Sequence, residues 1–227
     1  MHSENPDPAV TPPAGPRWQR RKQARPSEIL DAALVEFVEH GFSGSRLEDI
    51  ARRAGCTKGT IFLYFDNKQE LFKAMVRRTM LPVIETGESM LEQHDGAARE
   101  LLVKLLRQRF DYMTNTAACA LPKLMLAEAA NFPELARFYH EEIITRSHAI
   151  IERTLRLGVE RGEFRPIDTS NVARVAVAPL LLVAAWKFSF MKHAKVDLDA
   201  EAFFESGLDL LLRGIHRDTT PELPAHA

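Results

Sequence analysis

The sequence is poor in cysteine and has no long apolar run. Cys56 and Cys119 are its two cysteines among 227 residues, and they do not have the CxxC spacing of a zinc site. Two thiols cannot build a disulfide scaffold, and this usage is typical of a reducing cytosol. The longest uncharged apolar run, residues 175–186, has twelve residues, whereas a membrane-spanning helix needs about 20. We therefore expect neither a secreted disulfide-rich protein nor an integral membrane protein.

Catalytic motifs are also absent from the sequence. It contains no HExxH, GxSxG, Walker A or GxGxxG segment and no Glu-x-x-His pair. Its histidines, among them His94 and His148, have no second histidine at i+4, so a helical di-metal oxidase has little support. We expect no enzyme, no cofactor and no metal site.

The charge of the chain is divided unevenly, although its net value is only −1. Residues 17–78 hold 13 basic and 8 acidic side chains, whereas the remainder holds 17 basic and 23 acidic ones. A basic N-terminal third is expected where one end of a protein meets phosphates. Asymmetry of this size also arises by chance, so charge alone leaves nucleic-acid binding open.

The composition of the N-terminal end is typical of a disordered tail. Five prolines fall within the first 16 residues, and a basic arm that includes Arg17, Arg21 and Arg25 follows. We predict a disordered Pro-rich tail and basic arm over residues 1–22. The arm is either a solvated charge run or a segment that contacts the DNA backbone or minor groove.

Helical periodicity dominates the rest of the chain. Ile29, Ala33 and Phe37 recur at helical spacing, and Gly41 ends that helix. Asn67 and Glu70 read as the cap and third residue of another helix. No stretch alternates with a period of two, so the sequence predicts an all-α fold of about nine helices. The later helices are expected over residues 97–116, 121–130, 134–161, 169–192 and 199–214.

Two short helices separated by Gly55 and Cys56 form a helix-turn-helix pattern over residues 46–65. The segment from Ser45 to Glu48 has the S-x-x-E pattern of a capping box, which places the Ser45 hydroxyl on the Glu48 amide. In such a motif the second helix presents its N-terminal side chains to base edges in the major groove. A plain helical hairpin without a DNA role is the alternative at this point.

The residue pattern from Ile29 to Phe72 resembles the TetR/AcrR family of bacterial transcriptional regulators. The similarity extends over about 45 residues without a gap and includes Asp49-Ile50-Ala51, Lys58-Gly59-Thr60-Ile61 and Tyr64-Phe65. It implies a three-helix DNA-binding domain over residues 23–83, whose reader spans 46–65. It also implies a larger helical domain over residues 84–227 for ligand sensing and dimerisation.

Positions matched to the family's motif supply the candidate DNA contacts. Gly59 lets the backbone approach DNA closely, and Leu63 lies at a variable position that faces the bases. Lys68 falls at a lysine that clamps the DNA backbone. Arg46 and Phe62 depart from the residues common there, a small hydroxylated residue and a tyrosine. The candidate set is Ser45, Arg46, Thr57, Lys58, Gly59, Thr60, Leu63, Tyr64 and Lys68.

The resemblance also implies that the last two helices pair with those of a second copy in a four-helix bundle. Apolar residues of the last helix form a stripe that an isolated monomer would expose, namely Phe204, Leu208, Leu211 and Leu212. The family's ligand pocket lies among the middle helices. Bulky residues that could line it, or could equally be plain core, are Phe110, Met113, Leu121, Met125, Tyr139, Trp186 and Phe190, with His148 as a polar anchor or a surface residue.

We therefore expect a cytoplasmic, homodimeric repressor that binds double-stranded operator DNA, with no membrane partner. A small lipophilic or aromatic effector is expected to release it, because the candidate lining is apolar with few polar groups. Two alternatives remain open on the residues alone. They are an effector-independent DNA-binding factor and a helical protein-interaction module.

Overall fold

The computed structural model describes residues 17–191 and 198–217, with side chains from Pro26 onward. The tail predicted in residues 1–16 lies outside the described residues. Residues 17–22, which the sequence analysis assigned to the tail and arm, begin helix α1 (Arg17–Gly44) instead. Arginine, glutamine and lysine fill five of these six positions, and all three are strong helix formers.

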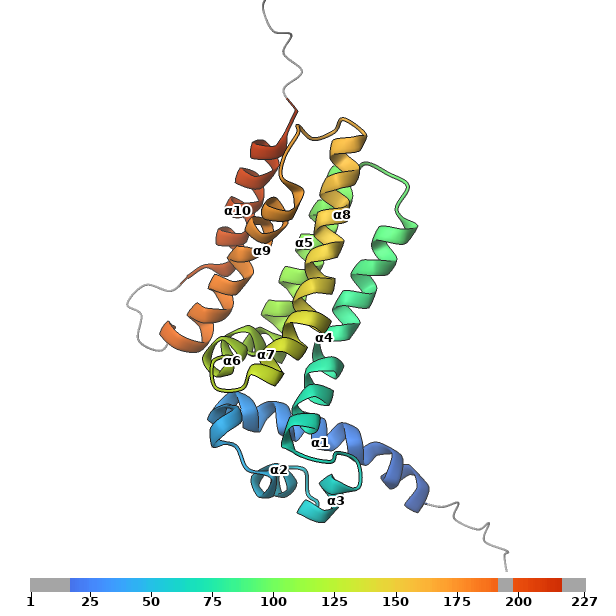
Figure 1. The fold of residues 1–227 in the computed structure, drawn as a ribbon, viewed down its shortest axis with the longest axis vertical. Helices are drawn as coiled ribbons and strands as arrows, with labels where there is room; N and C mark the ends of the chain where they lie inside the picture. The colour runs from blue at the N-terminus through green and yellow to red at the C-terminus, as the bar shows by residue number, and fades with distance from the viewer. Residues whose placement is uncertain (1–16, 192–197, 218–227) are drawn as a thin grey trace, which may run out of the picture.

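The N-terminal part is a small three-helix unit at one end of the molecule (Figure 1). Helix α1 packs against α2 (Leu47–Arg53), which is followed by the short α3 (Lys58–Phe62). Ile29, Ala33 and Phe37 are fully buried, as their helical spacing predicts. The predicted break at Gly41 is confirmed, because this residue has a φ of 73° inside α1.

Helix α4 (Lys68–Gln93) connects this unit to the larger body (Figure 1). The Asn67 side chain accepts a hydrogen bond from the Glu70 amide at 2.9 Å, which confirms the predicted cap. Because α4 runs without a break from Lys68 to Gln93, the domain boundary proposed after residue 83 falls inside one continuous helix. A displacement of the body can reach the N-terminal unit along α4.

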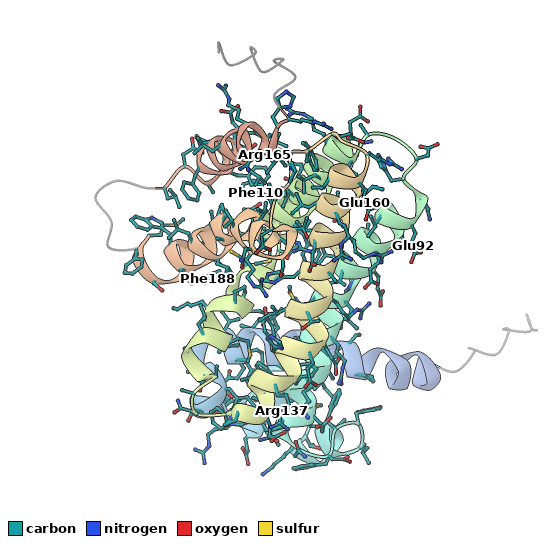
Figure 2. All side chains as sticks on the ribbon, turned by 45° about the horizontal axis from the view of Figure 1, so that its top comes forward. Glu92, Phe110, Arg137, Glu160, Arg165 and Phe188 are labelled. Carbon is teal, nitrogen blue, oxygen red and sulfur yellow. The ribbon has the colours of Figure 1, made fainter. Side chains whose placement is uncertain are left out.

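The body is built from the remaining helices. Helix α5 (Ala98–Asn115) lies beside α8 (Arg146–Glu160), and α9 (Thr169–Ala185) packs on both α8 and α10 (Ala200–Ile215). A 3₁₀ turn leads into α6 (Ala120–Glu128), and α7 (Pro133–Tyr139) follows. Helices α6 and α7 lie between the body and α1 (Figure 1). The ends of the body near Glu92, Glu160 and Arg165 are far from α3 (Figure 2).

Two π-helical segments extend the helices of the body. One, His140–Thr145, joins α7 to α8, so residues 133–160 form a single 28-residue rod, one residue earlier at each end than the predicted 134–161. The other, Trp186–Phe190, extends α9. Counted as continuous rods, the described residues contain nine helices and no strand, as predicted; one isolated antiparallel bridge joins Phe164 to His216.

Helix α9 with its π-helical extension is long and apolar enough to cross a membrane by length and composition alone, with a mean hydropathy of 1.6. The sequence analysis predicted this helix over residues 169–192, but it judged membrane spans only by uncharged runs and therefore did not single the helix out as a candidate span. Arg174 and Lys187 lie within it, and α9 packs against α5, α6, α8 and α10. These contacts are those of a packed helix in the body of a helical protein.

The apolar stripe predicted to lie exposed on the last helix is mostly buried. Phe204, Leu208 and Leu212 pack inside the body, and Leu211 is half-buried. Phe204 stacks on Phe110 of α5 with ring centroids 4.4 Å apart. The prediction of an exposed stripe was therefore wrong at these positions, because α5 and α9 already cover that face of α10.

Candidate DNA-reading helix and ligand pocket

The turn between α2 and α3 depends on Gly55. Its φ of 64° is a left-handed conformation that glycine adopts without strain. The Cys56 amide then donates to the Ala51 carbonyl at 2.9 Å, which closes the end of α2. Ile50 and Ile61 are fully buried and hold the two short helices together. The predicted helix-turn-helix geometry is present.

The beginning of α3 is ordered by its own cap. The Thr57 hydroxyl accepts a hydrogen bond from the Thr60 amide at 3.2 Å, and the two threonine hydroxyls lie 3.0 Å apart. Lys58 and Gly59 are exposed beside them. The outer surface of α3 thus combines hydroxyl, ammonium and bare backbone, which suits contacts to phosphates and base edges.

Apolar side chains extend this surface at the end of α3. Leu63 is 78% exposed, and its neighbours Phe62 and Tyr64 are exposed as well. Three consecutive exposed apolar or aromatic residues are unusual on a protein surface and mark contact sites. Leu63 could meet a thymine methyl group, as predicted for a position that faces the bases.

Ser45 does not cap α2. Its side chain is 3% exposed, and its hydroxyl donates to the Phe42 carbonyl at 2.9 Å. The cap residue of α2 is Arg46, which makes no side-chain capping bond. Glu48 instead accepts from Lys58 at 2.8 Å, and that bond lowers the pKa of Glu48. The predicted capping box was wrong because the Ser45 hydroxyl closes the end of α1, and a buried Ser45 side chain is not available to DNA.

Lys68 also turns toward the end of α1. Its ammonium donates to the carbonyls of Phe42 at 2.7 Å and Ser45 at 2.9 Å, and it lies 4.6 Å from the Phe42 ring centroid. Burial lowers the pKa of Lys68, while nearby Glu128 opposes this shift. A lysine ammonium has three donors, so two of them are committed within the protein. One donor therefore remains for a DNA phosphate, and the predicted clamping role of Lys68 stays a prediction.

Helix α6 of the body also contacts this end of α1. The Glu128 side chain is buried, and one of its oxygens accepts from the Ser43 amide at 3.2 Å. Phe132 packs edge-on against Phe42 at 4.6 Å. The sequence analysis did not single out Glu128, because a glutamate on a helix normally reads as a solvated charge.

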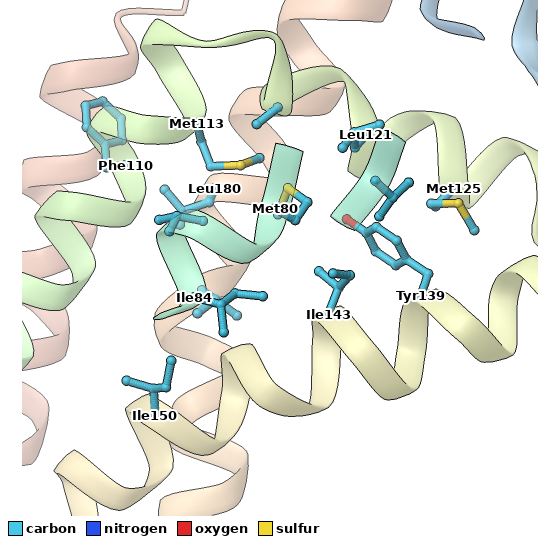
Figure 3. Packing of buried hydrophobic residues seen from close by; sticks show 14 of the residues in the cluster. Met80, Ile84, Phe110, Met113, Leu121, Met125, Tyr139, Ile143, Ile150 and Leu180 are labelled. Atoms are coloured by element: carbon cyan, nitrogen blue, oxygen red, sulfur yellow. The ribbon is translucent and has the colours of Figure 1, made fainter. Parts of the chain in front are cut away.

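A cavity of about 450 Å³ lies among α4, α5, α6, the α7–α8 rod and α9. One face of the rod contributes His140, Ile143, Ile144, Ser147 and His148, at the spacing of a single helical stripe. Part of this wall is the π-helical segment, a feature frequent at functional sites. Figure 3 shows Tyr139 and Ile143 pointing from the rod toward Met80 and Met125.

Four of the eight predicted pocket residues line this cavity, namely Met113, Met125, Tyr139 and His148. The other four lie elsewhere, so their assignment was wrong. Phe110 is engaged by Phe204, and Leu121 is fully buried. Trp186 and Phe190 pack on each other at 5.5 Å at the far end of α9, where Phe190 is 55% exposed. Helical spacing alone could not separate these positions from those that face the cavity.

The polar groups of the cavity are basic or neutral. Arg109 donates to the Ser147 carbonyl at 3.1 Å, and burial lowers its pKa to about 10. The pKa of His148 is lowered, first by burial and then by the positive charges of Arg109 and Arg174. Burial also raises the pKa of Tyr139. The sequence analysis missed Arg109, because an arginine on an amphipathic helix normally indicates a surface position.

Comparison with known protein families covers both parts of the chain. Residues 29–75 match the family described as bacterial regulatory proteins of the tetR family, and residues 93–197 match the tetracyclin repressor-like C-terminal domain. The fatty acid metabolism regulator protein of Bacillus subtilis (strain 168) is 28% identical over 199 residues. That alignment covers 86% of this chain and 98% of the relative.

Two solved structures share the fold and about a quarter of the sequence. The transcriptional regulator FadR from Bacillus subtilis, in complex with stearoyl-CoA, aligns with a TM-score of 0.66 at 26% identity and covers 84% of this chain and 99% of its own. SmeT, the repressor of the Stenotrophomonas maltophilia multidrug efflux pump SmeDEF, aligns with a TM-score of 0.67 at 26% identity, covering 87% and 93%. The chain therefore belongs to the tetR family of bacterial regulatory proteins and is a DNA-binding transcriptional regulator rather than an enzyme.

Proposed function

We propose that α3 reads operator DNA with Thr57, Lys58, Gly59, Thr60 and Leu63 and that Arg46 and Tyr64 add backbone contacts. All of these residues except the half-buried Thr60 are exposed at the end of the N-terminal unit, which supports this assignment. Ser45 and Lys68 act differently in the proposal. They set the angle between α1 and α2, and Lys68 has one donor left for a phosphate.

We further propose a homodimer through α9 and α10. One recognition helix reads only a few base pairs, so two half-sites are needed for specificity. Supporting this, exposed Val175 of α9 and Leu210 of α10 line a common groove of about 400 Å³. Gly207 approaches Pro179 within it, so the two helices lie close together. The protein would act in the bacterial cytoplasm, where operator DNA is found.

The effector is proposed to be a lipophilic molecule that occupies the cavity of about 450 Å³ lined by α4, α5, α6, the α7–α8 rod and α9. Met80, Met113 and Met125 supply an adaptable apolar wall. The stearoyl-CoA bound by the similar Bacillus subtilis regulator supports an apolar chain as part of the effector.

One observation carries the proposed release mechanism: α6 touches both the cavity and the DNA-binding unit. Pro122, Met125 and Leu126 line the cavity, while Glu128 of the same helix bonds to the end of α1. A ligand that shifts α6 would move the end of α1 and with it the spacing of two recognition helices. Each 1.4 kcal/mol of such coupling changes DNA affinity about tenfold.

A gel shift against the protein's own upstream DNA tests this function. We expect a specific complex that decanoyl-CoA or another lipophilic compound dissociates. Coupling is reciprocal, so an effector that weakens DNA binding must bind the DNA complex more weakly than the free protein. Equal effector affinity with and without operator would leave an effector-independent repressor as the better description.

A further inference from the structure

We propose that the cavity is a receptor for an amphipathic carboxylate, whose head pairs with Arg109 while its apolar body lies among Met80, Met113 and Met125. This inference rests on the proposed function, because it specifies the chemistry of the effector. It adds a charge that an apolar lining alone would not predict.

The first support is the lack of an acidic partner for Arg109. Arginines elsewhere in the body have carboxylate partners: Arg77 pairs with Glu142 at 2.6 Å, and Arg146 pairs with Glu88 at 2.8 Å. Among the described residues no ion pair involves Arg109, whose hydrogen bond goes to the neutral Ser147 carbonyl. Its guanidinium has five donors, so most of them remain available.

The second support is the composition of the cavity wall. It includes Arg109, His140 and His148 but no aspartate or glutamate. Arg174 adds further positive charge near His148. The electrostatic field inside the cavity therefore favours an anion, although the wall is otherwise apolar.

The energetics point the same way. Arg109 is half-buried, and taking a charge out of water without a counter-ion is costly, so proteins normally pair or neutralise such a charge. Arginine cannot readily give up its proton, so the remaining remedy is an anion supplied by the ligand. A carboxylate fits the planar guanidinium with two parallel hydrogen bonds. The Ser147 carbonyl holds the guanidinium on the rod side of the cavity, where such a head group would sit.

The proposal separates two kinds of lipophilic effector. A free carboxylic acid brings its own negative charge to Arg109. An alcohol of the same chain length fills the apolar wall but presents only a neutral oxygen. Hydrogen bonds to charged groups are stronger than those between neutral groups, so the acid is expected to bind about tenfold or more tightly than its neutral analogue.

The test compares decanoate, decanol and decanoyl-CoA by calorimetric titration of the full-length protein at pH 7.5. Wild type should bind decanoate about tenfold or more tightly than decanol. Arg109→Gln keeps a donor for the Ser147 carbonyl but removes the charge, so it should abolish this preference while decanol still binds. Arg156→Gln is the matched control, because that exposed arginine of α8 pairs with Glu152 on the surface. It should retain the full preference.

Equal binding of decanoate and decanol by wild type would overturn the proposal, as would an undiminished preference in Arg109→Gln. If that variant does not fold, Arg109→Lys replaces it and should reduce the preference, because an ammonium cannot form the paired bonds.

A gel shift separates the carboxylate proposal from the proposed release mechanism. Arg109-dependent decanoate binding without operator release contradicts only the proposed release mechanism. Release by decanoyl-CoA with no decanoate binding contradicts only the carboxylate receptor.

Discussion

Lys58 and Lys68 lie ten residues apart, yet their ammonium groups have different surroundings. Lys58 is exposed and pairs with the Glu48 carboxylate, a partner that it can exchange for a phosphate. Lys68 is half-buried and bonds to two backbone carbonyls at the end of α1. Replacing those bonds would leave two carbonyls unsatisfied in the protein. We therefore assign an electrostatic role at DNA to Lys58 and a positioning role to Lys68.

These roles lead to distinct outcomes for three substitutions. Lys58→Ala should weaken binding to all sequences alike and flatten the salt dependence by about one unit. Leu63→Ala should change the preferred base at one position and leave the salt dependence unchanged. Lys68→Ala should lower the Tm and weaken binding through the fold. Salt titrations on two operators and thermal melts separate the three effects. A Lys68 variant with an unchanged Tm but a flattened salt slope would restore the clamping role.

His148 makes stability depend on pH. Burial, together with Arg109 and Arg174, lowers its pKa, so the folded state binds a proton on this imidazole less readily than the unfolded chain does. The unfolded chain takes up a proton near pH 6.5. As the pH falls through that value, the unfolded state binds more protons and the free energy of unfolding decreases.

Urea unfolding at pH 7.5 and pH 5.5 measures this contribution. His148→Gln should show a smaller loss of stability between the two pH values than wild type, because the glutamine cannot titrate. His216→Gln provides a control at an exposed position. The assignment fails if His148→Gln and wild type lose the same stability on acidification.

At the scale of elements, α6 connects the cavity of the body to the N-terminal unit. It packs on both α1 and α9, and its Glu128 oxygen lies 2.6 Å from where a Cβ on Gly41 would project. The φ of 73° at Gly41 favours glycine, and a methyl group added there would also have to displace the Glu128 carboxylate. Because α6 approaches α1 closely, a small shift of α6 changes the angle between the helical body and the N-terminal DNA-binding unit.

A glycine series tests this packing. Gly41→Ala combines left-handed strain of about 1–2 kcal/mol with a clash against Glu128. Gly55→Ala has similar strain from its φ of 64° but no atom within 4 Å of the added methyl group. Gly44→Ala has no positive φ, and its closest contact would be an ordinary 3.8 Å. Urea unfolding should rank the losses Gly41, then Gly55, then Gly44. A Gly41 loss no larger than that of Gly55 would argue against tight packing of Glu128.

At the scale of the whole molecule, exposed apolar surface gathers on the outer side of α9 and α10. Val175 is 64% exposed and Leu210 is 71% exposed, although both belong to strongly apolar helices. Such patches on soluble proteins mark association sites. The buried stripe of α10 holds the subunit together, and the opposite face of α10 is the one through which we propose that a second copy binds.

Charge placed on that face should break the dimer. Leu210→Glu and Val175→Glu are expected to sediment as monomers near the 25.6 kDa chain mass at micromolar concentration, whereas wild type sediments as a dimer. They should also lose most specific operator affinity, because one half-site is insufficient. Val35→Glu, at an exposed site on α1, is the control and should remain dimeric. A wild-type monomer that binds DNA specifically would refute the dimer.

The sequence by itself determined the helices, the cap at Asn67, the turn at Gly55 and the helix-turn-helix pattern. These features depend on residues within about one or two helical turns of each other, so local spacing suffices to predict them. The tertiary structure alone decided the partners of Lys68, Glu128, Arg109 and Phe204. Their contacts join segments 23 to 94 residues apart in the chain. A side chain on a helix can face solvent, core or cavity with the same local pattern, and only the packing of distant helices selects among them.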